Sequence, residues 1–319
     1  MSLRNRLACL GAVCLLAAFA AAALACGGGG GAGGGVSASQ LTSPVQPAYA
    51  YDPNAITVTG AENFYADLLH QIGGSNLKIY SFLRDPNADP HQYESNAGDA
   101  RAVADSRLVI ENGLGYDAFM DHLLAASPDP SRVVINVQKL IAAQNGVNAH
   151  VWYDPTVMPR LAEEVSSALA RLDPAHAPTY ASNLATFQDS LKPLDDEVAS
   201  LKQRYRGVPI AFTEPVFGYM AEAIGLSVKS PRVFMKAIEE GNDPPSTAVA
   251  AEQDLITKHR VRALVYNSQT ITKVTTRIKD LAKKNGIPVV GVSETEPAGK
   301  TFQDWQLSQL RDLDAALSG

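Results

Sequence analysis

The sequence has little cysteine, and none of it lies in the part that can fold. The 319 residues include three cysteines, Cys9, Cys14 and Cys26, all within the first 26 positions. An internal disulfide or a thiolate ligand is therefore excluded from the rest of the chain. A metal site there would have to be built from His, Asp and Glu side chains.

Three further absences exclude whole classes of protein. The net charge of −6, from 27 Lys and Arg against 33 Asp and Glu, gives no basis for binding nucleic acid or an anionic membrane surface. After the N-terminal leader, no apolar run approaches the ~20 residues of a membrane span. The His-Glu-x-x-His pattern of zinc peptidases is also missing.

The N-terminus has the pattern of an exported protein. Arg4 and Arg6 precede an apolar stretch over residues 7–25, which ends in Ala-Leu-Ala before Cys26. This order is typical of a signal peptide, and the cysteine after small residues resembles a bacterial lipobox, although Ala23 replaces the usual leucine. We expect residues 1–26 to be a signal peptide with Cys26 lipidated, which places the protein in the periplasm or on the outer face of the cytoplasmic membrane. A plain signal peptide without lipidation is the alternative.

The next segment, residues 27–50, is rich in Gly and then in Ser, Pro and Ala, and predicts a flexible tether. From position 56 short runs of β-branched and apolar residues alternate with helical or loop sequence, which predicts parallel sheets built from β–α units. The predicted strands are residues 56–59, 77–82, 108–110, 133–136, 210–212, 264–266 and 288–292.

A long helical stretch separates the two groups of strands. We expect one helix to begin near Thr156, with Asp154 as its N-cap. A second helix of about 28 residues follows, with Pro193 expected to kink it. Its apolar residues alternate at spacings of four and three, as in an amphipathic helix; they are Tyr180, Leu184, Phe187, Leu191, Leu194, Val198, Leu201 and Tyr205.

These patterns predict an α/β protein of two lobes, each a parallel sheet flanked by helices, bridged by one long helix. The predicted boundaries are residues 51–175 for the N-terminal lobe, 176–206 for the bridging helix and 207–319 for the C-terminal lobe. A single domain with a long surface helix is the alternative.

Two of the six histidines lie in distinctive contexts. His91 lies in residues 89–94, Asp-Pro-His-Gln-Tyr-Glu, in the loop after the predicted strand 77–82. His150 lies in residues 148–155, Asn-Ala-His-Val-Trp-Tyr-Asp-Pro, just before a predicted helix. Ligands of open α/β sheets bind beyond the C-terminal ends of the strands, so both histidines are candidate metal ligands.

Together these motifs resemble those of the zinc/manganese-type substrate-binding proteins of bacterial ABC transporters. Residues 89–94 and 148–155 match two motifs of that family in the right order. Residues 112–117, Asn-Gly-Leu-Gly-Tyr-Asp, resemble its Asn-Gly-x-Gly-x-Glu turn, and residues 173–183 resemble the entry to its central helix. The resemblance covers about residues 54–317.

The resemblance implies two further ligands in the C-terminal half. The segment at residues 213–219, Thr-Glu-Pro-Val-Phe-Gly-Tyr, places Glu214 at a ligand position. The family also has an acid after the last strand, where this chain offers Glu294 and Glu296. The register favours Glu294, and Glu296 is the alternative.

The implied metal site is therefore His91, His150, Glu214 and Glu294, holding one Zn²⁺ or Mn²⁺ ion, with Fe²⁺ as a further candidate. Imidazole suits zinc and carboxylate suits manganese, so the ligand types leave the metal open. We expect three more side chains to hydrogen-bond to the ligands and fix the orientation of the imidazole rings; these are Asn148, Asp154 and Tyr93.

The implied function is capture of a divalent metal ion and its delivery to the permease of an ABC importer, by a monomer that is not an enzyme and binds no nucleic acid. Two alternatives remain. One is a metallohydrolase, which would need an open coordination position and a nearby base. The other is a metal-binding surface adhesin that works without a transporter.

Overall fold

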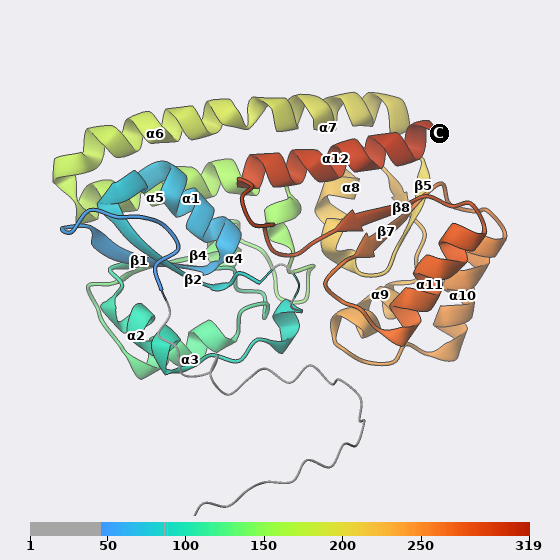
Figure 1. Cartoon of the computed structure of the whole chain (residues 1–319), viewed down its shortest axis with the longest axis horizontal. Coiled ribbons are helices and arrows are strands. Elements are labelled where there is room, and N and C mark those ends of the chain that lie inside the picture. The colour runs from blue at the N-terminus through green and yellow to red at the C-terminus, as the bar shows by residue number, and fades with distance from the viewer. Residues whose placement is uncertain (1–45, 86, 88) are drawn as a thin grey trace, which may run out of the picture. The chain divides into compact units, whose positions relative to one another are not determined.

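A computed structural model of the chain describes residues 46–85, 87 and 89–319. It contains two sheets, each of four strands, and every strand pair in them is parallel (Figure 1). The predicted signal peptide, Cys26 and most of the predicted tether lie outside the described residues. Within the described part, no helix combines the length and apolarity needed to cross a membrane.

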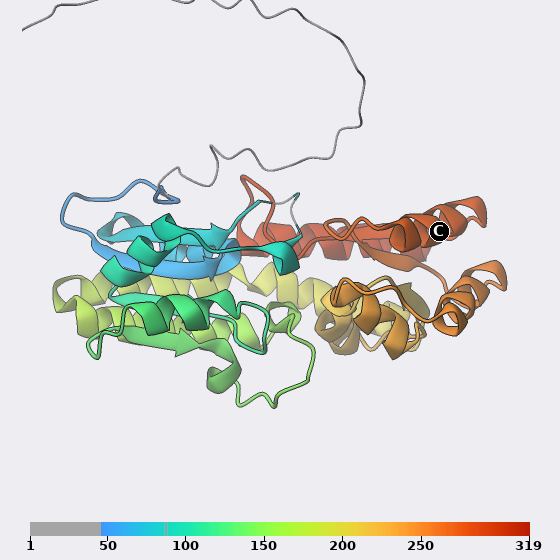
Figure 2. The same ribbon diagram turned by 90° about the horizontal axis from the view of Figure 1, so that it is seen from below.

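The first sheet has the strand order β2-β1-β3-β4. The strands are β1 (Ile56–Glu62), β2 (Leu77–Leu83), β3 (Leu108–Glu111) and β4 (Val133–Asn136). Side chains on both faces are buried, as expected when helices cover a parallel sheet on both sides. On one side α1 (Asn63–Gly73) packs against α5 (Val157–Leu172). The opposite side is covered by α2 (Ala97–Asp105) and α3 (Phe119–Ala126), and α4 (Val137–Leu140) directly follows β4 (Figure 2).

The second sheet has the same kind of order, β6-β5-β7-β8. The strands are β5 (Pro209–Phe212), β6 (Ser227–Val228), β7 (Leu264–Asn267) and β8 (Val289–Val292). The helices of this half are α8 (Gly218–Ile224), α9 (Arg232–Glu239), α10 (Ser246–Thr257), α11 (Lys273–Lys284) and α12 (Phe302–Ser318).

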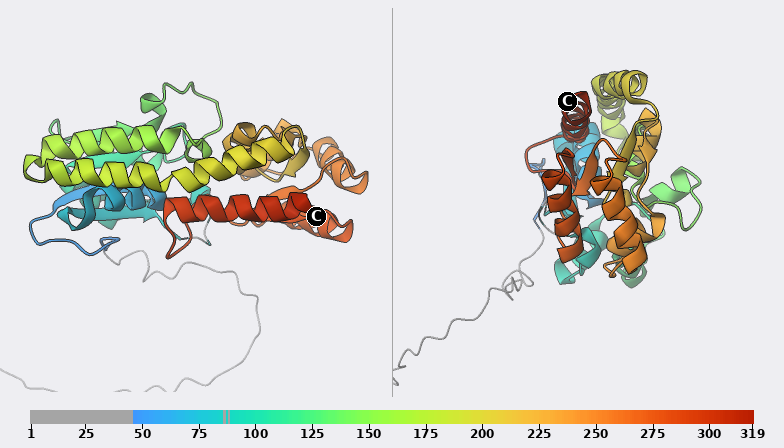
Figure 3. Two further views of the ribbon diagram at one scale, coloured as in Figure 1. Left: turned by 90° about the horizontal axis from the view of Figure 1, so that it is seen from above. Right: turned by 90° about the vertical axis from the view of Figure 1, so that its right-hand side faces the viewer.

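The stretch predicted as one long helix is divided into two helices. They are α6 (Ala177–Ser190), which packs against α1 and α5, and α7 (Lys192–Tyr205), which packs against α8 and α12 (Figure 3). The predicted kink at Pro193 is present as a break between these two helices, because Pro193 lacks the N–H that would continue the hydrogen-bond ladder. The break is mild, since Leu191 between the two helices keeps right-handed helical angles.

The apolar stripe predicted for this region faces the core along both helices. Tyr180, Phe187, Leu194 and Leu201 are buried, and Leu184, Val198 and Tyr205 are partly buried against the same cluster. One predicted detail nearby is corrected: the N-cap of α5 is Thr156, and Asp154 instead accepts hydrogen bonds from the Thr156 N–H and hydroxyl.

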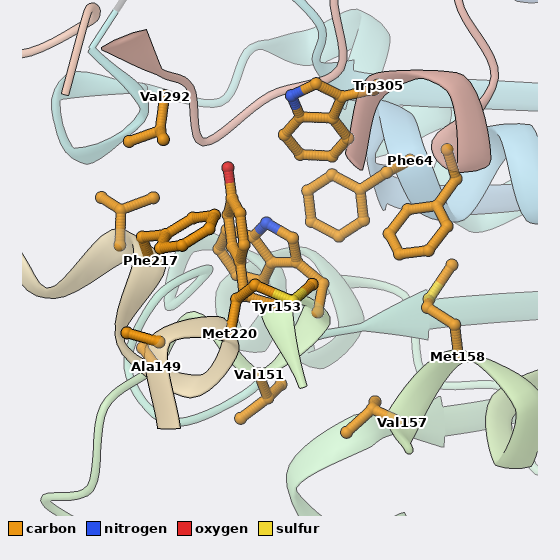
Figure 4. Close-up of a cluster of buried hydrophobic side chains, with 14 of the residues drawn as sticks. Phe64, Ala149, Val151, Tyr153, Val157, Met158, Phe217, Met220, Val292 and Trp305 are labelled. Carbon is orange, nitrogen blue, oxygen red and sulfur yellow. The ribbon is translucent and has the colours of Figure 1, made fainter. Parts of the chain in front are cut away.

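One continuous hydrophobic cluster runs through both halves of this fold. At its centre aromatic side chains from distant segments meet (Figure 4). Phe64 of α1 stacks on Trp152, with ring centroids 4.6 Å apart, while Tyr153 packs against Phe217 and against Trp305 of α12. The Trp305 Nε1–H also donates to the Ser293 hydroxyl, at 3.0 Å. The two sheets are thus fixed to each other by close packing as well as by α6 and α7.

A buried carboxyl group ties β5 to the layer of helices beside it. Glu252 of α10 accepts a hydrogen bond from the Ser230 hydroxyl at 2.9 Å, and the Ser230 Oγ accepts one from the Phe212 N–H at 2.7 Å. Burial raises the pKa of Glu252 to about 8, although the hydrogen bond from Ser230 opposes this rise.

This raised pKa makes the stability of the fold depend on pH. Glu252 keeps its proton in the folded protein at pH values where the unfolded chain, with a pKa near 4.5, has lost it. The resulting stability is complete below pH 4.5 and is lost as the pH rises towards 8. We predict that Glu252→Gln raises the free energy of unfolding by roughly 3 kcal/mol at pH 8 and changes it little at pH 4.5. Urea unfolding at both pH values measures this, with the exposed Glu222→Gln as control; equal effects of Glu252→Gln at the two pH values would contradict it.

Candidate metal centre

The sequence-predicted ligands lie where strands of the two sheets end. His91 lies in a 3₁₀ turn, Pro90–Gln92, on the connection after β2, and His150 immediately precedes another, Val151–Tyr153. In the other half, Glu214 follows β5 and Glu294 follows β8. The C-terminal ends of parallel strands share one edge of a sheet, which brings these side chains towards one place.

Three of the four predicted ligands meet directly. The Nε2 atoms of His91 and His150 lie 3.4 Å and 3.3 Å from the same carboxylate oxygen, Oε2 of Glu294. One ligand atom from each residue lies within 4.8 Å of the others. Donors about 2.1 Å from a tetrahedral cation are themselves about 3.4 Å apart, so this spacing is the one a bound transition metal requires.

The electrostatics of the centre favour an ionised carboxylate. Burial alone raises the pKa of Glu294, but the hydrogen bond and charge of His150, with the charge of His91, outweigh it and leave that pKa below its ordinary value. Burial lowers the pKa of His150, yet the contact with Glu294 raises it overall. The charged forms of Glu294 and His150 thus stabilise each other, and both side chains are fully buried.

Glu214 stands beside this trio and is linked to it by Asn267. The Asn267 Nδ2 group, at the end of β7, donates to Glu214 Oε2 and, at 2.7 Å, to Glu294 Oε1. Burial, followed by the negative charge of Glu294, raises the pKa of Glu214 to about 8. Its other oxygen, Oε1, is buried and has no hydrogen-bond partner among the described residues. Burial therefore favours the protonated form of Glu214 in the metal-free protein, and a cation would have to displace that proton before binding this oxygen.

The orientation of His150 is fixed from the opposite side of its ring. The Asn148 Oδ1 lies 2.7 Å from His150 Nδ1 and accepts the proton on that nitrogen, so a neutral imidazole in this position would offer the lone pair of Nε2 to a metal ion. Asn148 Nδ2 donates to the carbonyl of Pro215 at 2.7 Å, which ties the His150 loop to the other half of the fold. A glycine is needed alongside, because a Cβ at Gly218 would lie 2.8 Å from Asn148 Nδ2.

Two of the three side chains expected to orient ligands do not contact them. Tyr93 donates its hydroxyl to Asp99 at 2.7 Å, and Asp154 supports the start of α5. Only Asn148 of the three contacts a proposed ligand. Asn267 was missed by the sequence analysis, although a polar residue at the end of an apolar strand is a signal that could have found it.

Glu296, the alternative to Glu294, is not part of the cluster formed with the two histidines. Its backbone N–H and carbonyl pair with the Asn63 side chain, at 2.9 Å and 2.7 Å. Burial, and then the nearby charge of Asp67, raises the pKa of Glu296 to about 9. Of the two acids after β8, the structure brings Glu294 to the histidines.

A cleft of about 810 Å³ leads to this centre. His91, Tyr116 and Asn148 line it from one half of the fold, and Pro215 and residues of α9 line it from the other. Glu239 of α9 is among these, with its Oε1 3.7 Å from His150 Nδ1. A cation can therefore approach between the two halves.

The fold and the centre define a class of protein, the two-lobed binding proteins that hold a cation between parallel-sheet lobes. The chain belongs to the family described as zinc-uptake complex component A, periplasmic (ZnuA), which matches residues 58–316. The predicted fold class and the family resemblance are both confirmed.

The relatives have low sequence identity to this chain but align with more than half of its length. The manganese-binding lipoprotein MntA of Halalkalibacterium halodurans is 25% identical over 183 residues, which are 54% of this chain and 59% of that protein. The iron-binding protein YfeA of Yersinia pestis is 24% identical over 237 residues, 71% of this chain and 73% of that one. Among solved structures, the periplasmic zinc-binding protein TroA of Treponema pallidum has a similar fold, with a TM-score of 0.71 at 21% identity over 82% of this chain and 99% of its own.

The double role of Asn267 generates a prediction about stability. Asn267→Asp removes the donors to Glu214 and Glu294 and adds a third buried carboxyl group. We predict a loss of about 3 kcal/mol in the unfolding free energy of the metal-free protein. A saturating divalent metal ion should recover part of this loss, because it offsets the added charge.

Urea unfolding with and without metal measures both effects. The matched control is Asn145→Asp, which adds the same charge at an exposed position where the oxygen still accepts from Gln138. If the two variants were equally stable without metal, Asn267 would have no part in holding the carboxylates.

Proposed function

We propose that this protein captures one divalent transition-metal ion outside the cytoplasm and delivers it to the permease of an ABC importer. The proposed ligands are His91, His150, Glu214 and Glu294. The observation that carries the proposal is the buried convergence of two imidazole Nε2 atoms on one carboxylate oxygen, at 3.4 Å and 3.3 Å. Family membership supports it independently.

The charges of the four groups suit a divalent cation. Two neutral imidazoles and two carboxylates balance the charge of M²⁺, which lowers the cost of burying the ion. Without metal, Glu214 keeps its proton at neutral pH. A metal ion would displace that proton and bind the oxygen that has no partner in the described structure.

The physiological metal is zinc, manganese or iron in this proposal. The relatives compared above are described as manganese-, iron- and zinc-binding proteins. Imidazole donors suit zinc, and carboxylate donors suit manganese, so the mixed set is compatible with each.

The proposal includes export and a membrane partner. The family description is of a periplasmic component of an uptake complex. We infer that Cys26, which lies outside the described residues, carries the lipid anchor, and that the protein works as a monomer. We also propose the division into an N-terminal lobe (51–175), a bridging segment (176–206) and a C-terminal lobe (207–319).

We propose binding without catalysis. A catalytic metal site keeps an open coordination position, with a water molecule near a base. Here three side chains converge, and we propose that Glu214 joins them as a fourth ligand, which would fill a tetrahedral site. The metallohydrolase alternative therefore has no observation in its favour.

The first test is metal stoichiometry and mass-action stabilisation. We expect one equivalent of Zn²⁺ or Mn²⁺ to bind and to raise the melting temperature of the full chain. His150→Ala should lose the bound metal and the stabilisation, because the buried Nε2 ligand is gone. His122→Ala, at an exposed position on α3, should keep both. A wild-type protein without bound metal or thermal shift would overturn the proposed function.

A second test separates the two acids after β8. We predict that Glu294→Gln weakens metal binding at least 100-fold, because a neutral amide replaces the carboxylate between the histidines. Glu296→Gln should leave the affinity within a few-fold of wild type, since Glu296 is not part of the cluster that Glu294 forms with the histidines. Competition with a chelator measures both dissociation constants. A larger loss in Glu296→Gln would reverse the assignment.

A further inference from the structure

Tyr116 lies at the metal centre although none of the proposed metal chemistry uses it. It belongs to residues 112–117, the tight loop after β3, and it lines the cleft. Its ring meets His91 edge-on, with centroids 5.5 Å apart, and contacts His150 at 5.8 Å and Trp152 at 4.8 Å. The Tyr116 ring thus contacts both of the proposed imidazole ligands.

The loop holds Tyr116 in place at a cost in backbone strain. Three consecutive residues have positive φ: Gly113 at 75°, Leu114 at 59° and Gly115 at 80°. Leu114 is the unfavourable one, because its Cβ crowds the left-handed conformation. Asp117 accepts hydrogen bonds from the N–H groups of Asn112 and Gly113, at 2.6 Å and 2.8 Å, which holds the loop in this shape. Strain maintained in this way is characteristic of functional sites.

The Tyr116 hydroxyl is buried without a hydrogen-bond partner among the described residues. The residue is only 7% exposed, and a buried hydroxyl normally has a hydrogen-bond partner. By contrast, the Tyr65 hydroxyl, which is also buried, donates to Asn112 Oδ1 at 2.7 Å. A tyrosine hydroxyl carries an O–H that it can donate. The Tyr116 ring packs against both histidines that flank the Glu294 carboxylate, which makes that carboxylate the acceptor to consider.

The oxygens of Glu294 have different surroundings. Oε2 faces both histidines, and Oε1 accepts from Asn267 Nδ2 at 2.7 Å. A carboxylate oxygen accepts two hydrogen bonds, so Oε1 has one position left. A second donor there would occupy Oε1 fully and leave Oε2 alone to bind a metal ion.

Building on the proposed function, we propose that Tyr116 determines metal choice, by donating its hydroxyl to Glu294 Oε1 in the metal-bound protein and so limiting that carboxylate to one-oxygen coordination. A single oxygen from Glu294 favours a four-coordinate ion, and zinc takes four ligands in a tetrahedron. Manganese takes six, mostly oxygen, and gains from a carboxylate that binds through both oxygens. Tyr116 is in this respect a positioning residue that favours zinc over manganese.

The test is Tyr116→Phe in the full chain, which keeps the ring and removes only the hydroxyl. Dissociation constants for Zn²⁺ and Mn²⁺ are measured separately by chelator competition at one pH. We expect the ratio of the manganese constant to the zinc constant to fall about tenfold, because Glu294 becomes free to bind through both oxygens. The electron paramagnetic resonance spectrum of bound Mn²⁺ should change as well, which reports the altered coordination directly.

Tyr180→Phe is the matched control, since it removes the hydroxyl of another buried tyrosine, one that donates to Asp173 and not to the loop that holds Tyr116. It should leave the ratio unchanged. A Tyr116→Phe ratio within twofold of wild type, or an equal weakening of both metals, would overturn the inference and leave the proposed function standing. Wild-type protein that binds neither metal would overturn both together.

Discussion

The burial of the Glu294 carboxylate between the two lobes is the constraint on which the rest of the structure depends. A carboxylate without water contact is costly unless opposite charge and hydrogen bonds surround it. His91 and His150 come from one lobe and Asn267 from the other, while the Glu294 N–H donates to Gln269 Oε1 at 2.5 Å. The partners of this one group therefore have to arrive from both halves of the chain at fixed positions. Neither lobe alone could satisfy the carboxylate.

The aromatic core explains how those positions are fixed. Phe64, Trp152 and Trp305 come from three distant segments and pack as one cluster beneath the centre. Tyr153, which follows His150 on the same loop, donates its hydroxyl to the carbonyl of Ser293 at 2.7 Å. Because Ser293 directly precedes Glu294, this hydrogen bond links the two segments that carry these ligands. The ligand-bearing loops are thus anchored at their bases by close packing, which is precise to a few tenths of an ångström. Large opening of the lobes would break this core, so metal entry has to involve the cleft loops.

Much of this architecture is predictable from sequence, because apolar β-branched runs mark buried parallel strands. Two elements, β6 and α12, were not predicted from the sequence, and each has a physical reason. β6 has only two residues and no pattern to detect. The buried face of α12 includes Gln303, Gln306 and Gln309 beside its apolar residues. These polar residues interrupt the periodic spacing of apolar residues that would predict the helix. Gln303 and Gln309 form hydrogen bonds specific to the folded state, such as Gln309 Oε1 with the Ser293 N–H, whereas the buried Gln306 amide has no partner among the described residues.

The residues of the metal centre also differ in how well the sequence predicts them. His91 and His150 are found from sequence because their motifs are local and contiguous, whereas Asn267 and Tyr116 contact the centre through neighbours 25 or more residues away in the chain. Glu214 is an intermediate case: its position follows from the resemblance, but its raised pKa follows from burial beside Glu294, which only the tertiary structure supplies. The residues that tune a site are harder to predict than those that form it, since tuning depends on contacts between segments.

The two imidazoles at the centre are not equivalent, and this asymmetry sets the direction of approach. The His150 side chain is fully buried, whereas that of His91 is 25% exposed and lies on a short turn at the cleft. With the ligands proposed above, a cation arriving through the cleft would meet His91 before it reached the carboxylates. Release would follow the reverse order, because His91 is the one proposed ligand that is not buried. The His91 ring also packs against Tyr116, so its turn is connected to the aromatic core through that side chain.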